Sequence, residues 1–257
     1  MAIVSFVAAT LAWAGPARAD LIVVSGSTTS LNGGTIDLGC TDVVVGGTLN
    51  VDTGSLVNVR HVTIQAGGTI DGGSGTITLG GDWANAGQFV PGTGVVRFRD
   101  QCALAAAEIS GNTTFATASF VSATGKNYTF AVGTQQTIGQ LLEIAGTTTF
   151  PIQFRSGAAG QVANINLLGG GTQLIQHVGV TDVWATGQWL APSLTNEGGG
   201  GNANRWFGSP VVGAQQRSVP TIGEAMLALL AAALATMGAW SARRRKHVTD
   251  ESRPPRP

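Results

Sequence analysis

Charged side chains are scarce in this sequence. They make up 11% of its 257 residues, and 14 basic residues balance 14 acidic ones. Nucleic-acid binding depends on an excess of positive charge, so the composition gives no basis for a nucleic acid as partner. The acids of the body are scattered singly, without an Asp-Asp or Asp-x-Asp pair. Because enzymes that cleave polysaccharides need clustered carboxylates, we expect no catalytic residue and no enzyme activity.

Patterns typical of metal sites are missing as well. His61 and His177 have no further His or Cys at the short, fixed spacing of a zinc site. Asp182, Glu197 and Asn202 surround the glycines at 198–201 and offer the oxygen ligands that calcium prefers. The regular repeat of calcium-binding rolls is absent, which favours loop formation as the role of these residues. We therefore expect no metal and no cofactor.

The first residues read as an export signal. An almost continuous apolar run extends from Phe6 to Ala14, and the small-x-small pattern Ala17-Arg18-Ala19 precedes Asp20. This pattern predicts a signal peptide at 1–19 that signal peptidase removes, so that the mature chain begins at Asp20. A buried first helix is the alternative. No Lys or Arg precedes Arg18, which leaves the true start codon open.

The last residues read as a membrane anchor. The stretch from Ala225 to Trp240 is apolar except for Thr236, and a basic cluster follows at Arg243, Arg244, Arg245 and Lys246. Counted from 222 to 242, the run reaches the length of about 20 residues that spans a bilayer. Basic residues stay on the cytoplasmic side and stop the helix there, which places the body of the chain outside that membrane. The alternative is a C-terminal core helix, but the run has no polar stripe.

A short motif connects this tail to a known family. The apolar run is preceded by Val219-Pro220-Thr221-Ile222-Gly223-Glu224. Motif, helix and basic cluster, in this order, resemble the IPTL-CTERM sorting domain of exported proteins in Gram-negative bacteria. The resemblance implies that an exosortase, a membrane-embedded transpeptidase of the cysteine protease type, recognises residues 219–224. It also implies passage through the inner membrane and a final place at the cell surface or outside the cell, and it leaves cleavage of the tail open.

The body of the chain shows strand periodicity. Short segments such as Gly47-Thr48-Leu49 and Gly68-Thr69-Ile70 alternate apolar and polar residues and are separated by glycine turns. The 21-residue spacing between these two segments suits one coil of a solenoid. We therefore predict an all-β fold, a right-handed parallel β-helix, with a β-sandwich as the alternative.

A second resemblance concerns the body. Gly81-Asp82-Trp83 and the later Gly111-Asn112-Thr113-Thr114-Phe115 resemble modules of bacterial surface proteins and autotransporter-like proteins. This resemblance implies a β-helix at the cell surface and says nothing of a reaction. Trp184, Trp189 and Trp206 lie late in the body, where they either cap the open end of the core or stack on sugar rings.

The two cysteines present a geometric problem. In an exported chain, Cys40 and Cys102 would be expected to form a disulfide. Their 62-residue separation is about three coils of 21 residues. At ~4.8 Å per coil, equivalent positions lie about 14 Å apart, beyond the reach of a disulfide unless a loop leaves the stack. The disulfide and two buried free thiols therefore remain alternatives.

Together these patterns divide the chain into five parts. They are a signal peptide at 1–19, a β-solenoid at 20–207, a linker at 208–218, a sorting signal with its transmembrane helix and basic stop at 219–247, and a polar tail at 248–257. The expected function is a structural or adhesive role at the cell surface. The alternative is a β-helix that binds or cleaves carbohydrate, with a surface polysaccharide as a further candidate partner.

Overall fold

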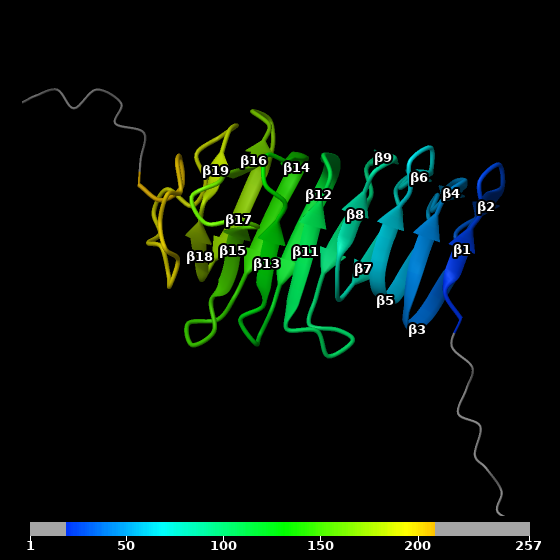
Figure 1. Cartoon of the computed structure of the whole chain (residues 1–257), viewed down its shortest axis with the longest axis horizontal. Helices are drawn as coiled ribbons and strands as arrows, with labels where there is room; N and C mark the ends of the chain where they lie inside the picture. The colour runs from blue at the N-terminus through cyan, green and yellow to red at the C-terminus, as the bar shows by residue number, and fades with distance from the viewer. Residues whose placement is uncertain (1–18, 209–257) are drawn as a thin grey trace, which may run out of the picture. The chain divides into compact units, whose positions relative to one another are not determined.

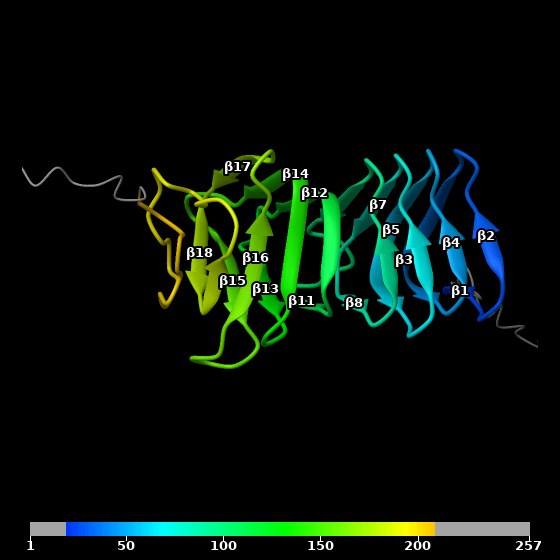
Figure 2. The same cartoon turned by 90° about the horizontal axis from the view of Figure 1, so that it is seen from above.

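The body of the chain is a β-solenoid. The computed structural model describes residues 19–208, which contain strands and no helix. They wind in stacked parallel coils of about eight turns (Figure 1, Figure 2). Every strand pair within these residues is parallel, which confirms the predicted β-helix and excludes the β-sandwich, whose sheets are antiparallel.

Most strands are short, and four are long enough to turn a corner of the coil. The strands are β1 (Leu21–Val23), β2 (Thr28–Ser30), β3 (Thr35–Val45), β4 (Thr48–Asn50), β5 (Ser55–Ile64), β6 (Thr69–Asp71), β7 (Thr76–Leu79), β8 (Trp83–Asn85), β9 (Gln88–Val90), β10 (Val95–Phe98), β11 (Ala106–Ser110), β12 (Thr113–Val121), β13 (Asn127–Phe130), β14 (Gln135–Ala145), β15 (Ile152–Ser156), β16 (Ala163–Leu167), β17 (Thr172–Gln176), β18 (Val178–Thr181) and β19 (Val183–Ala185).

The coils present three faces. The first face contains β1, the second halves of β3 and β5, and then β8, β11, β13, β15 and β18. The second face contains β2, β4, β6 and β9, and farther along the first halves of β12 and β14 with β16 and β19. The third face contains the first halves of β3 and β5, then β7 and β10, the second halves of β12 and β14, and β17.

The glycine turns set the length of each coil. Thr28, Thr48, Thr69 and Gln88 share one register position, which makes successive coils 20, 21 and 19 residues long. The turn from the second to the third face repeats a backbone hydrogen bond from residue i+3 to residue i, as in Gly34 N–H to Leu31 O at 2.8 Å. Its second residue has a positive φ in four consecutive coils: it is Asn32, Asp52, Gly73 and Gly92 in turn. These are the residue types that adopt this conformation at least cost.

The core changes character along the solenoid. In the first three coils it consists of aliphatic side chains, such as the fully buried column of Val23, Val45 and Ile64. From the fourth coil onward aromatic rings join the aliphatic side chains: Phe98 and Phe120, in register on β10 and β12, stack with ring centroids 4.5 Å apart. Burial of each such ring contributes roughly 1.5–3 kcal/mol. The apolar side chains that the alternation directs into the core are therefore the main source of stability.

Candidate functional site

The sorting residues of the tail cannot be placed in this fold. The motif at 219–224, the apolar run and the basic cluster at 243–246 lie outside the described residues, as do Ala17 and most of the expected signal peptide. Between residues 19 and 208 no helix is long and apolar enough to cross a membrane.

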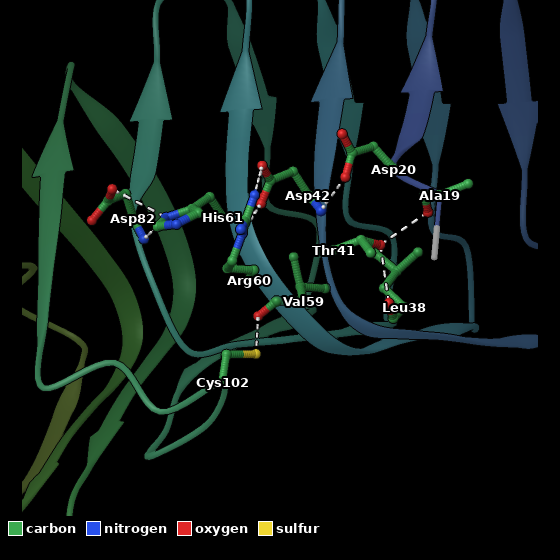
Figure 3. A network of polar contacts seen from close by, with 10 residues as sticks. All are labelled: Ala19, Asp20, Leu38, Thr41, Asp42, Val59, Arg60, His61, Asp82 and Cys102. Atoms are coloured by element: carbon green, nitrogen blue, oxygen red, sulfur yellow. Dashed lines mark hydrogen bonds and ion pairs between the residues drawn. The ribbon is translucent and has the colours of Figure 1, made fainter. Parts of the chain in front are cut away.

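Ala19 and Asp20, on the two sides of the expected cleavage point, stand at the start of the first coil. The carbonyl of Ala19 accepts a hydrogen bond from Thr41 Oγ1 at 2.9 Å, and Asp20 Oδ1 accepts one from the backbone N–H of Asp42 at 2.9 Å (Figure 3). Thr41 Oγ1 also lies 3.0 Å from the carbonyl of Leu38. In a chain that begins at Asp20, Thr41 Oγ1 therefore keeps the Leu38 carbonyl as its acceptor, and the Asp20 carboxylate still accepts the N–H of Asp42.

Asp20 begins a column of polar side chains on the outer side of the first face. At the same register position in the next coils stand Asp42, His61, Asp82 and Glu108. The N–H of Asp82 donates to His61 Nδ1 at 2.9 Å (Figure 3). The N–H of Glu108 donates to Asp82 Oδ1 at 2.7 Å. In each case the side chain of one coil accepts a hydrogen bond from the backbone N–H of the next coil. These acids satisfy the backbone between coils, which is a structural task.

Arg60 adds the one bidentate ion pair of this column. Its Nε and Nη2 donate to the two carboxylate oxygens of Asp42 at 2.9 and 2.8 Å. The hydrogen bond from Arg60 holds the pKa of Asp42 below its ordinary value, although partial burial of the carboxyl opposes this. Because the guanidinium group is well exposed, the pair contributes little to the free energy of folding.

The remaining acids do not gather in one groove. Each of three carboxylates accepts a hydrogen bond from a backbone N–H: the donor is Asn32 for Asp52, Gly73 for Asp71 and Ala123 for Asp100. Among residues 19–208, no three His, Cys, Asp or Glu side chains are arranged so that they could hold a metal ion. One surface hollow of about 690 Å³ lies beside β5, β8 and β11, and its lining, which includes Thr63, Asn85 and Ser110, contains no titratable side chain.

The residues first considered for calcium shape the last coils instead. Asp182 Oδ1 accepts a hydrogen bond from Asn202 Nδ2 at 2.6 Å, and its other oxygen accepts the N–H of Gly160 at 2.9 Å. These hydrogen bonds lower the pKa of Asp182, and the one from Asn202 has the larger effect. Asn196 binds both the N–H and the carbonyl of Val180. The loop-forming role expected from the sequence is the one that the contacts support.

His177 and Glu197 form a pair that sequence reasoning did not join. Nδ1 of His177 lies 3.1 Å from Glu197 Oε2, and its Nε2 lies 3.3 Å from the hydroxyl of Thr148. This order of hydroxyl, imidazole and carboxylate is that of a nucleophile with its base. However, Thr148 is exposed on the loop between β14 and β15, and the group links that loop to residues 177 and 197 of neighbouring coils.

The two cysteines form a disulfide. Their Cα atoms are 5.4 Å apart. Cys40 lies at the corner of β3, whereas Cys102 lies in the loop between β10 and β11, where its Sγ comes within 3.8 Å of Val59 O (Figure 3). The separation of about 14 Å expected from coil spacing applies to equivalent strand positions only, and Cys102 does not occupy one. The loop leaves the stack and reaches back to an earlier coil.

Lys126 is a buried cation that no sequence pattern indicated. Its side chain is 1% exposed, and Nζ donates to the carbonyls of Gly80 and Arg99, the second at 3.2 Å. Nζ also lies 5.9 Å from the ring centroid of Tyr128. Burial lowers the pKa of the Lys126 amine. The side chain ties the start of β13 to the turns that follow β7 and β10.

The tryptophans late in the body take two different positions. Trp206 is 3% exposed and packs against Phe154 with ring centroids 6.2 Å apart, so it closes the end of the core as the capping interpretation predicts. Trp184 lies on the outer side of β19 and is partly exposed, with its indole N–H donated to Asn202 Oδ1 at 3.2 Å. Trp189, also partly exposed, lies near Gln173, whose amide donates to the Trp189 carbonyl at 2.8 Å.

Comparison with known proteins finds a likeness in the tail alone. Neither the curated proteins nor the solved structures contain a significant match to this chain. Residues 217–245 match the family model of the IPTL-CTERM motif, and this match includes the motif at 219–224 and the first three basic residues of the stop. The motif implies a C-terminal sorting system with a membrane processing enzyme, and hence export to the cell surface.

Proposed function

We propose that this chain is a structural or adhesive surface protein without catalytic activity, whose motif at 219–224 is recognised by an exosortase. The observation that carries the proposal is the match of residues 217–245 to the IPTL-CTERM motif. In this proposal the apolar run holds the chain in the inner membrane of a Gram-negative cell, the basic cluster remains cytoplasmic, and the signal peptide has been removed before Asp20.

The body supports a non-catalytic role. The acids of its first face accept backbone N–H groups of neighbouring coils, and the hollow of about 690 Å³ offers no acid or base. A stack of coils closed by an aromatic cap presents a regular outer surface, which suits structural or adhesive display.

Mapping the C-terminus of the mature chain tests the sorting step. The full chain is expressed in a Gram-negative host that carries a matching exosortase, and the envelope fraction is analysed by mass spectrometry. We expect loss of the residues beyond the 219–224 motif and a protein accessible to protease on intact cells.

Two variants sharpen this test. Pro220→Ala changes the motif and should leave the tail intact, whereas Pro210→Ala in the linker should be processed like the wild type. An intact C-terminus in the inner membrane for the wild-type chain would contradict processing and would reduce the tail to an anchor.

A further inference from the structure

The second face carries an unusual outer surface in its last three coils. Six side chains point outward from β14, β16 and β19 and the residue that follows β19; we call them the neutral patch. They form two columns in register: Gln135, Asn164 and Trp184, and beside them Thr137, Asn166 and Thr186. The patch thus contains amides, hydroxyls and one indole, and no charged group.

The two amides at the centre of the patch remain available for a ligand. Neither Asn164 nor Asn166 has a side-chain hydrogen bond within residues 19–208, although both are partly exposed. Three other residues of the patch bond to one another: the Thr186 hydroxyl donates to Gln135 Oε1 at 3.2 Å, and Gln135 Nε2 donates to the Thr137 hydroxyl at 3.5 Å. An amide donates and accepts at the same time, and this matches a sugar hydroxyl, which also does both.

Trp184 is held in position before any ligand arrives. Its indole N–H donates to Asn202 Oδ1, and the amide of Asn202 donates in turn to Asp182 Oδ1 at 2.6 Å. This chain of hydrogen bonds fixes the ring at the edge of the patch and occupies its only polar atom. What remains is the apolar face of the indole, a rigid platform for another flat apolar surface at low entropic cost.

The charge distribution restricts the class of ligand. The column on the first face holds Asp20, Asp42, Asp82 and Glu108, whereas the neutral patch lies on a different face and has neither acids nor bases. A polyanion or a cation would find no counter-charge there.

We propose that the neutral patch binds an uncharged polysaccharide along the axis of the solenoid. In this arrangement a sugar ring stacks on Trp184, and hydroxyls of neighbouring residues bind the amides of Asn164 and Asn166. Coils repeat every ~4.8 Å, so a chain of sugars meets a regular series of donors and acceptors. The proposal specifies which class of ligand the protein would adhere to, and it rests on the adhesive function proposed above.

Affinity electrophoresis of the purified full chain tests the patch. Native gels are cast with a neutral polysaccharide, such as dextran, hydroxyethylcellulose or galactomannan, or with the acidic polymers alginate and polygalacturonate. We expect retardation in at least one neutral gel and none in the acidic gels. Trp184→Ala should weaken the interaction at least tenfold, whereas Trp184→Phe, which keeps an aromatic face, should retain most of it.

Further variants separate loss of binding from loss of fold. Asn166→Asp replaces a donor by a charge on an exposed side chain and should also weaken binding, whereas Arg60→Ala on the first face should not. Retardation by none of the neutral polymers, stronger retardation by the acidic ones, or equal binding by wild type and Trp184→Ala would each overturn the proposal. Protease accessibility on intact cells, measured in parallel, reports the surface role separately, so failure of the patch is distinguishable from failure of display.

Discussion

At the scale of single residues, Lys126 shows how far a solenoid departs from its repeat. Many buried side chains follow the alternation of strand residues, but this lysine is directed inward just before β13 and donates to two turn carbonyls. A buried amine is stable only when it is hydrogen-bonded, and here it also satisfies Gly80 O and Arg99 O. The residue stabilises the region where the loop carrying Cys102 leaves the stack.

Replacing this lysine with an apolar residue should be destabilising. In Lys126→Met the stem of the side chain is kept, but the carbonyl of Gly80 loses its donor, whereas that of Arg99 keeps the N–H of Gln101. We expect a loss of about 1–3 kcal/mol in the free energy of unfolding. Urea denaturation followed by circular dichroism measures it. Stability equal to the wild type would show that these hydrogen bonds contribute nothing net.

The same residue predicts a dependence on pH. Burial lowers the pKa of Lys126 in the folded state below its ordinary value of 10.5, so the unfolded state binds more protons in the window between the two values. The free energy of unfolding therefore rises with pH through this window. We expect the stability difference between wild type and Lys126→Met to widen as the pH rises from neutral toward 10.5. A difference that narrows would contradict this sign.

At the scale of structural elements, the turns and the loop at 99–105 decide the path of the chain. Gly92 occupies the turn between β9 and β10 with a φ of 53°, and a Cβ there would meet Gly73 O of the previous coil at 2.0 Å. The backbones of the two coils approach too closely at this corner to admit a side chain at residue 92. Gly169, by contrast, has an ordinary φ and open space around the position of a Cβ.

These two glycines form a matched pair for mutation. Gly92→Ala should destabilise the protein by more than about 2 kcal/mol, since it combines an unfavourable φ with a clash against backbone. Gly169→Ala should be neutral or slightly stabilising, because it reduces the freedom of the unfolded chain without strain. Thermal unfolding of both variants checks the contrast. Equal effects would mean that the corner can open to admit a side chain.

The disulfide belongs to the same scale, because it attaches the loop at 99–105 to the corner of β3. It closes a segment of 62 residues, so its reduction should cost about 2–5 kcal/mol, mostly through the greater freedom of the unfolded chain. We expect dithiothreitol to lower the melting temperature and to open residues 99–105 to protease. The double variant Cys40→Ser/Cys102→Ser should be insensitive to dithiothreitol, and a wild type equally insensitive would argue against the bond.

At the scale of the whole molecule, each coil is stabilised by its neighbours, and the two ends differ. Phe120 lies inside the stack and contacts the rings of Phe98, Tyr128 and Phe154. Leu31 lies in the first coil, where β1 and β2 each have a strand partner on one side only and Ile22 is 60% exposed. In such one-dimensional stacks, a defect inside interrupts the coupling of coils, whereas a defect at the end affects mainly the end.

Hydrogen exchange distinguishes these two cases. Phe120→Ala should cost about 3–5 kcal/mol and accelerate exchange in strands on both sides of β12. Leu31→Ala should accelerate exchange in β1, β2 and the start of β3 only. Acceleration throughout the molecule for Leu31→Ala would show that the solenoid unfolds as one unit.

The sequence alone was sufficient for the architecture and for the nature of the tail. Strand alternation and the glycine turns between strands are local properties, and the 21-residue spacing of the repeated segments predicts stacked coils. The sorting motif is a contiguous string, so it can be recognised without a fold. Capping was one of the two roles that the late place of Trp206 in the chain allowed, and its burial decides for it.

Only the tertiary structure decided what lies beside what. The 99–105 loop has no periodicity, so the closeness of Cys102 to Cys40 and the reach of Lys126 to Gly80 could not be derived from spacing. Coil register brings residues such as Gln135, Asn164 and Trp184 together although 20 to 29 residues separate them in the chain. Small differences in coil length and strand bends set this register. Local sequence therefore determines that coils form, and their stacking determines which side chains share a surface.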